Sequence, residues 1–225
     1  MDRIIKKQIE TYRPNFLEHG ISPKGTFQND LITQEERHLE LLNPLFKHKS
    51  THFSICDVGS GLCDLHGLLN KLNIAHDYTG IEIVDEMVEA SKKLWPRANV
   101  VNADILDPSF KETFDFVVLS GTFNIPGSVP INDWESFVFK MIKAMYDHCK
   151  IGISFNALTT YSTFRDGHLF YLSPEKVFSF IQSQLSRFCC LNTSYPLYEV
   201  TYTVFRPENL KEQFPQPAFQ KYFKK

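Results

Sequence analysis

The 225-residue sequence lacks any hydrophobic run that approaches the roughly 20 residues of a membrane-spanning helix. Its first residues, MDRIIKKQIETYR, also lack the apolar stretch that forms the core of a signal peptide. We therefore expect a protein that stays in the cytoplasm and has no membrane partner.

An excess of positive charge is also missing. The chain has 24 Lys and Arg residues against 26 Asp and Glu residues, which gives a net charge of −2. A protein that binds nucleic acid non-specifically needs a basic surface field. The balance of charge therefore points to a small-molecule partner rather than to nucleic acid, and it indicates nothing about the oligomeric state.

Cysteine is scarce and is not arranged for metal binding. The five cysteines are Cys56, Cys63, Cys149, Cys189 and Cys190. None of them forms a CxxC pair, and no histidine stands at the intervals of a zinc site. We expect free thiols in a reducing compartment and no metal site.

Hydrophobic residues, in contrast, are plentiful. They make up 43% of the chain and include 20 phenylalanines, enough for the core of one α/β domain. Residues 1–50 have helical periodicity and predict an N-terminal helical preface or lid. Its first helix should end before a break from Gly20 to Gly25, and its second should run from about Thr33 to Phe46, with Thr33 as the N-cap.

Residues 51–225 alternate between strand and helix patterns, which predicts a mostly parallel sheet covered on both faces. The expected strands are 53–58, 78–82, a short strand from 100, 114–119, 150–155, 188–193 and 198–205, and the expected helices are 62–72, 84–94, 134–146 and 174–185. In such sheets, ligands bind outside the carboxyl ends of the strands. The motifs that carry chemistry stand at those ends.

Two of these motifs indicate a cofactor that contains adenosine. Gly59-Ser60-Gly61 joins the first strand to a helix, where glycines allow a tight turn and helix N–H groups face a ligand. Glu82 ends the second strand, where a carboxylate can accept hydrogen bonds from both ribose hydroxyls. Each motif alone is also compatible with a plain turn or a solvated carboxylate.

The charges near the turn decide between two cofactor classes. A dinucleotide site prefers G-x-G-x-x-G, but the sixth position here is Asp64. A carboxylate at the start of the helix would repel a pyrophosphate, and Asp57 adds a second negative charge. The ammonium group of an adenosyl amino acid suits such a site, so S-adenosylmethionine is favoured over NAD.

The residues Asp57-Val58-Gly59-Ser60-Gly61 followed by Glu82 resemble motif I and the next acidic position of class I S-adenosylmethionine-dependent methyltransferases. The segments 102–105 and 114–121 resemble that family's adenine-reading segment and its motif IV. More narrowly, the runs SGTFN (120–124), FNALT (155–159), FYLSP (170–174) and YPLYE (195–199) resemble one bacterial branch whose substrates are mostly unassigned. The resemblance covers nearly the whole chain. It implies a Rossmann-like class I methyltransferase fold with a seven-stranded sheet, mostly parallel, whose last strand is antiparallel.

The resemblance also implies roles for individual residues. The methionine end of the cofactor would be held by Asp57, Gly59, Ser60 and Gly61, and the ribose by Glu82. The adenine would contact Ile83, Met87, Asp104 and Ile105. The methionine chain near the transferable methyl group would be lined by Ser120 and Gly121. Cys63 departs from the pattern, because many members of the family have a third glycine at this position.

The acceptor side is less defined. Phe27, Thr122, Phe123 and Asn124 are candidates for the substrate pocket, and His168, Tyr171, Tyr195 and Glu199 are candidates for a general base or an orienting group. Each of these last four could equally be a surface or core residue. Methyl transfer to a good nucleophile often needs only proximity and in-line alignment, so a base is not indispensable.

These observations favour an S-adenosylmethionine-dependent methyltransferase that acts on a small-molecule or sugar-like acceptor by in-line displacement. An RNA or protein methyltransferase would need a basic groove at the carboxyl edge of the sheet. A catalytically silent S-adenosylmethionine-binding module is a third possibility, which the acidic residues Asp57, Glu82 and Asp104 argue against. A nicotinamide enzyme is the weakest alternative.

Overall fold

A single seven-stranded sheet organises the computed structural model, which describes residues 3–47 and 52–223, with the strand order β3-β2-β1-β4-β5-β7-β6. The strands are β1 (Phe53–Val58), β2 (His76–Glu82), β3 (Asn99–Asn102), β4 (Phe114–Leu119), β5 (Cys149–Leu158), β6 (Cys189–Asn192) and β7 (Glu199–Phe205). The first five strands pair in parallel, and β7 runs antiparallel to β5 and β6. The predicted fold class is confirmed, including the antiparallel last strand.

The helices are α1 (Arg3–His19), α2 (Leu31–Leu42), α3 (Asp64–Lys71), α4 (Asp85–Leu94), α5 (Ile131–Asp147), α6 (Pro174–Phe180), α7 (Pro207–Gln213) and α8 (Pro217–Gln220). Short 3₁₀ turns η1 (Lys24–Thr26), η2 (Leu45–Lys47) and η4 (Lys221–Phe223) and a π-helical turn η3 (Ile181–Leu185) complete the elements. None of the helices within 3–47 and 52–223 has the length and apolarity needed to cross a membrane.

Alternating side chains of the strands build a core on each face of the sheet. Val117 and Leu119 of β4 pack with Ile142 of α5 in one cluster. Phe116 and Val118, the intervening residues, pack in a second cluster with side chains of α2, η2 and α3. Because successive strand residues point to opposite faces and both faces are covered, the run from Phe116 to Leu119 is apolar throughout.

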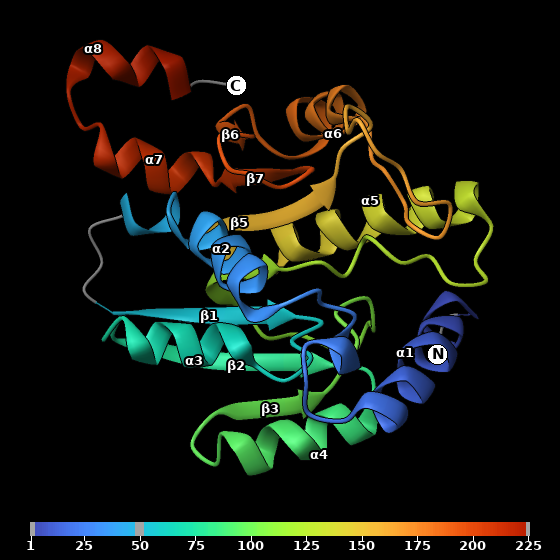
Figure 1. Ribbon diagram of the computed structural model, residues 1–225. Coiled ribbons are helices and arrows are strands. Elements are labelled where there is room, and N and C mark those ends of the chain that lie inside the picture. Colours follow the sequence, from blue (N-terminus) through green and yellow to red (C-terminus); the bar gives the residue numbers. More distant parts are fainter. Residues whose placement is uncertain (1–2, 48–51, 224–225) are drawn as a thin grey trace.

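The N-terminal helices lie on two sides of the strand ends. Figure 1 shows α1 beyond the arrowheads of the parallel strands, whereas α2 lies across one face of the sheet. Helix α1 contacts η1 and α4, and α2 contacts α3, β5 and β7. The segment between α1 and α2 therefore passes the carboxyl edge of the sheet.

The N-cap prediction for the second helix is wrong. The cap is Asp30, whose side chain accepts the Thr33 N–H at 2.8 Å, and the helix begins at Leu31. An aspartate carboxylate is at least as strong an N-cap as a threonine hydroxyl, so the earlier residue prevails. The C-terminal helices α7 and α8 were not anticipated. The predicted boundary at Thr51 lies outside the described residues.

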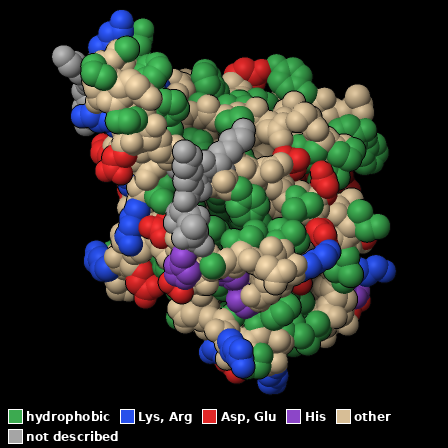
Figure 2. All heavy atoms as spheres, turned by 90° about the vertical axis from the view of Figure 1, so that its left-hand side faces the viewer, with side chains coloured by type: hydrophobic (Ala, Val, Ile, Leu, Met, Phe, Trp, Pro, Cys, Tyr) green, Lys and Arg blue, Asp and Glu red, His purple; other side chains and the backbone are tan. Residues whose placement is uncertain are grey.

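Charges are mixed on the face that Figure 2 shows, which looks onto the left-hand side of Figure 1. Lys and Arg side chains stand among Asp and Glu side chains there and do not form one continuous basic area.

Candidate functional site

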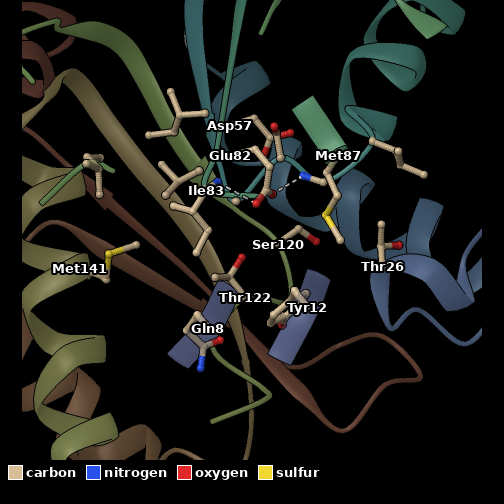
Figure 3. Close-up of a pocket in the computed structure, with 18 of the residues that line it drawn as sticks. Gln8, Tyr12, Thr26, Asp57, Glu82, Ile83, Met87, Ser120, Thr122 and Met141 are labelled. Atoms are coloured by element: carbon tan, nitrogen blue, oxygen red, sulfur yellow. Dashed lines mark hydrogen bonds between the residues drawn. The ribbon is translucent and has the colours of Figure 1, made fainter. Parts of the chain in front are cut away.

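A pocket opens at the carboxyl ends of β1, β2 and β4, and the N-terminal segment forms its other wall. Its walls from the sheet side include Asp57, Gly59, Ser60, Gly61, Glu82, Ile83, Met87, Asp104, Ile105, Ser120 and Gly121. Gln8, Tyr12, Thr26, Gln28, Gln34 and His38 line it from the N-terminal side. Figure 3 shows Asp57, Glu82 and Ser120 facing Gln8, Tyr12 and Thr26.

The glycine turn after β1 shapes the floor of the pocket. Gly59 and Gly61 have φ values of 67° and 53°, in the left-handed region that favours glycine. A Cβ on Gly59 would lie 2.5 Å from Thr122 Oγ1. The turn therefore lets the end of β4 pack directly against it, which brings Thr122 to the same pocket.

Glu82 lies at the end of β2 and is held by backbone donors. Its Oε1 accepts the N–H groups of Ile83 and Val84 at 2.7 and 3.0 Å, and its Oε2 accepts the Gly61 N–H at 3.0 Å. Burial raises the pKa of Glu82, and these three N–H groups oppose the rise. The carboxyl group is thus fixed in place before any ligand arrives, and it links β2 to the glycine turn.

Asp57 is the second buried carboxyl group of the site. It is 4% exposed, and its Oδ2 accepts the Tyr78 hydroxyl at 2.8 Å. Burial raises the pKa of Asp57 to about 7; the Tyr78 hydrogen bond opposes this, and the nearby Asp64 and Glu82 carboxylates add to it. A positively charged ligand group would relieve this repulsion.

Asp64 and Gln34 form a polar contact across the pocket wall. Gln34 Nε2 donates to Asp64 Oδ2 at 2.8 Å, which joins α2 to the first turn of α3. Burial raises the pKa of Asp64, and the Gln34 hydrogen bond lowers it. This amide covers the carboxylate that argued against a dinucleotide.

Two buried polar atoms in the lining have no hydrogen-bond partner among the described residues. They are Ser120 Oγ and Gln8 Oε1, on opposite walls of the pocket. Gln8 is anchored by its Nε2, which donates to the Pro126 carbonyl at 3.1 Å. Buried polar atoms usually have partners, so these two indicate a polar ligand in the pocket.

The pocket does not include the four candidates for a catalytic group. His168 is exposed, and its N–H donates to Asp166 Oδ1 within the same loop. The Tyr171 hydroxyl accepts the Asp166 N–H, and the Tyr195 hydroxyl contacts Thr201 Oγ1. The bond of His168 is from its backbone, whereas the two tyrosine hydroxyls stabilise their own loop and strand. None of these three residues lines the pocket.

Glu199, the fourth candidate, also lies outside the pocket lining but close behind it. The side chain is 1% exposed and forms an ion pair with Arg37, whose Nε lies 2.7 Å from its Oε1. Its other oxygen accepts from Asn156 Nδ2. With both oxygens bonded in the interior, Glu199 is not placed to accept a proton from a ligand.

Of the substrate-pocket candidates, only Thr122 lines the pocket. Phe27 packs edge-on against Tyr12 with ring centroids 5.1 Å apart, and Phe123 is fully buried in the core. Asn124 accepts the Leu158 and Phe170 N–H groups through its side chain and backbone. The expectations for these three residues need correction, because their side chains serve the core or the loops.

Sequence reasoning missed the polar side chains of α2 that face the pocket. Gln34 and His38 are four residues apart and therefore share one face of the helix. Burial lowers the pKa of His38 to about 4, and the neighbouring Arg37 contributes. Leu41 and Leu42 are buried on the same side of α2 as Gln34 and His38. The polar i, i+4 pair on this otherwise apolar side was the available signal for the pocket.

Comparisons with known proteins agree with this geometry. Residues 55–150 match a family model described as a methyltransferase domain. A Mycobacterium tuberculosis protein, Rv1506c, itself named only provisionally as a methyltransferase, is 32% identical over 157 residues, which cover 68% of this chain and 92% of that protein.

Solved structures share the fold. The N-methyltransferase NodS from Bradyrhizobium japonicum, in complex with S-adenosylhomocysteine, has a TM-score of 0.65 and 15% identity, and the match covers 89% of this chain and 99% of that one. Magnesium protoporphyrin IX methyltransferase from Synechocystis, with bound S-adenosylmethionine, has a TM-score of 0.62 and 11% identity, with coverages of 88% and 97%.

Proposed function

Because this chain belongs to the class I S-adenosylmethionine-dependent methyltransferases, we propose that it transfers the methyl group of S-adenosylmethionine to a small-molecule or sugar-like acceptor. One observation carries the proposal. All the residues expected to hold the cofactor line a single pocket, and the N-terminal segment forms the opposite wall. An acceptor held between them would lie next to the cofactor.

The residues of the pocket fit this cofactor. Asp57 would hold the ammonium group of the methionine moiety, and Glu82, fixed by three N–H groups, would accept the ribose hydroxyls. The partnerless Ser120 Oγ would gain a hydrogen bond from the ligand. Near the adenine, Ile83, Met87 and Ile105 would supply apolar contacts.

When bound, S-adenosylmethionine supplies a methyl group on a positively charged sulfur, ready for attack by a lone pair of the acceptor. The protein's contribution is to hold the acceptor atom in line and to exclude water. The described lining contains no side chain in an evident position to act as a strong base. His38 is neutral near pH 7 and can accept a hydrogen bond, but its low pKa makes it a weak proton acceptor.

The charge of the pocket supports an uncharged or cationic acceptor. Among the described lining residues, Asp57, Asp64, Glu82 and Asp104 carry carboxyl groups, and none is a lysine or arginine. The other polar groups on the N-terminal wall are neutral, mainly amides and hydroxyls. Neutral groups of this kind suit the hydroxyl or amine groups of a sugar-like molecule, whereas a phosphate would find no cationic side chain in the described lining.

A screen with S-adenosylmethionine labelled in the methyl group tests the acceptor class. We expect label to enter neutral or amine-bearing metabolites, with much less in their phosphorylated counterparts. Preferential labelling of an RNA, a protein or a phosphorylated metabolite would contradict the acceptor proposal and leave the cofactor assignment intact.

Residues 1–50 are proposed to act as a lid over the acceptor. Thr26 and Gln28 line the pocket, and they lie in the break between α1 and α2. We expect residues 15–30 to become more protected from hydrogen exchange when S-adenosylhomocysteine binds, because the ligand would order this segment. The C-terminal helices α7 and α8, whose residues do not line the pocket, serve as the internal control.

A preface with a purely structural role would give another result. It would show the same exchange in residues 15–30 with and without the ligand. The acceptor would then approach an open surface, which would favour a macromolecular substrate.

A further inference from the structure

A charged pair buried between the N-terminal segment and the sheet has no role in the function proposed so far. Arg37 of α2 and Glu199 of β7 lie 2.7 Å apart, Nε to Oε1, with side chains 11% and 1% exposed. Removing two charges from water is costly, and a hydrophobic pair of similar size often stabilises a protein as well or better. Stability alone therefore does not account for an ion pair at this position.

The pair belongs to a longer chain of hydrogen bonds that ends at the cofactor side of the pocket. Glu199 Oε2 accepts from Asn156 Nδ2, and Asn156 Oδ1 accepts the Gly121 N–H at 2.9 Å. A trans peptide holds its C=O opposite its N–H. The contact with Asn156 on β5 therefore turns the Ser120 carbonyl away from Asn156 and fixes the orientation of the peptide between two residues of the pocket lining.

The other end of the chain reaches the N-terminal wall. Arg37 Nη1 donates to Gln28 Oε1. Arginine has only donors, so it fixes the amide of Gln28 with its oxygen towards the interior. Gln28 Nε2 then lies beside Gly121, at 3.2 Å from the position of a Cβ built on that glycine. The two ends of this series of hydrogen bonds, Gly121 and Gln28, thus both lie in the pocket lining.

We propose that Arg37, Glu199 and Asn156 are positioning residues that couple the Ser120–Gly121 turn to Gln28 on the N-terminal wall. The proposal rests on the proposed function, since Ser120 and Gly121 would contact the cofactor. Binding of the cofactor at the turn fixes the Gly121 peptide. The series of hydrogen bonds through Asn156, Glu199 and Arg37 then holds Gln28 in one orientation. In this orientation Gln28 presents its N–H groups to the pocket beside the cofactor.

A double-mutant cycle on S-adenosylhomocysteine binding tests the coupling without any knowledge of the acceptor. Gln28→Met and Asn156→Ser change the two ends of the chain, and dissociation constants are measured by calorimetry for both single variants and the double variant. Residues in one hydrogen-bond network have non-additive effects. We expect the fold-change in the dissociation constant of the double variant to differ by at least about threefold from the product of the fold-changes of the two single variants.

Two comparisons make the cycle specific. Gln8→Met changes another amide of the lining, one that takes no part in this series of hydrogen bonds. The fold-change in dissociation constant of the Gln8→Met/Asn156→Ser double variant should therefore equal the product of the two single fold-changes. The first cycle is then repeated in an Arg37→Met/Glu199→Met background, which replaces the ion pair by hydrophobic side chains. In this background the fold-changes in dissociation constant of Gln28→Met and Asn156→Ser should simply multiply.

The possible outcomes separate this inference from the proposed function. If the fold-changes of Gln28→Met and Asn156→Ser in the dissociation constant simply multiply in the native background, the coupling is overturned. It is also overturned if their deviation from multiplication persists when Arg37 and Glu199 are replaced. The first of these results stands even if the Met/Met background does not fold. Failure of the unmodified protein to bind S-adenosylhomocysteine would instead overturn the proposed function, and the coupling with it.

Discussion

Replacing Glu82 with alanine is expected to weaken the binding of S-adenosylhomocysteine by roughly 10- to 150-fold. Hydrogen bonds to a charged group contribute about 1.5–3 kcal/mol, which corresponds to this range of dissociation constants. The three backbone N–H groups that bond Glu82 hold its carboxyl group in one position, so no reorganisation is needed when the ribose binds.

Calorimetry on the purified variant measures this effect directly. Glu89→Ala is the matched control, because Glu89 is an exposed glutamate of α4 that does not line the pocket. A thermal melt shows whether the Glu82 variant still folds. A folded Glu82 variant whose dissociation constant equals that of the unmodified protein would refute the ribose assignment.

Replacing Asp57 with asparagine is expected to remove a pH dependence of ligand binding as well as affinity. The pKa of Asp57 is raised to about 7 in the unliganded protein, so the carboxyl group is partly protonated near neutral pH. An ammonium group binds the ionised form. Affinity for S-adenosylhomocysteine should therefore increase as the pH rises from 6 to 8, and binding near pH 6.5 should release a proton.

The variant should bind roughly tenfold or more weakly at pH 8 and should lose most of this pH dependence, because the charge-assisted contact is absent. Titrations in buffers with different ionisation enthalpies measure the proton release. Asp77→Asn, at an aspartate whose side chain is 76% exposed, is the control. Equal proton release from the Asp57 variant and the unmodified protein would exclude Asp57 as the partner of the ammonium group.

The raised pKa of Asp57 also makes the folding stability of the unliganded protein depend on pH, in the direction opposite to ligand binding. The native state binds the Asp57 proton more tightly than the unfolded chain, whose aspartate has its ordinary pKa near 3.8. This contribution to the free energy of unfolding is present below about pH 4 and is lost as the pH rises through about 7. Ligand binding and unliganded stability should therefore respond to pH in opposite directions through this residue.

The residues proposed to hold the cofactor could be brought to one pocket from the sequence, because their positions at the strand ends are determined locally. Gly59, Gly61 and Glu82 stand at the ends of strands whose hydrophobic patterns are clear, and parallel strands bring their carboxyl ends to one edge. The acidic Asp64 at the start of α3 favoured an adenosyl amino acid over a dinucleotide, and in the structure its carboxylate accepts a hydrogen bond from Gln34.

The acceptor half could not be predicted in the same way, because it depends on how distant segments pack. Arg37 and Glu199 are separated by 162 positions in the sequence, and nothing local to either residue indicates that they meet. Phe123 follows the strand end and was expected in the pocket, but the chain turns at Gly121 and buries the ring in the core. Tertiary packing, rather than local pattern, decides which of these side chains face the ligand.

The most direct test of the central claim is a pair of calorimetric titrations of the unmodified protein, one with S-adenosylhomocysteine and one with NAD. The carboxyl groups of Asp57 and Asp64 beside the glycine turn favour an ammonium group and disfavour a pyrophosphate. We predict saturable binding of S-adenosylhomocysteine with one site per chain and no measurable binding of NAD. Tight binding of NAD without binding of S-adenosylhomocysteine would contradict the account.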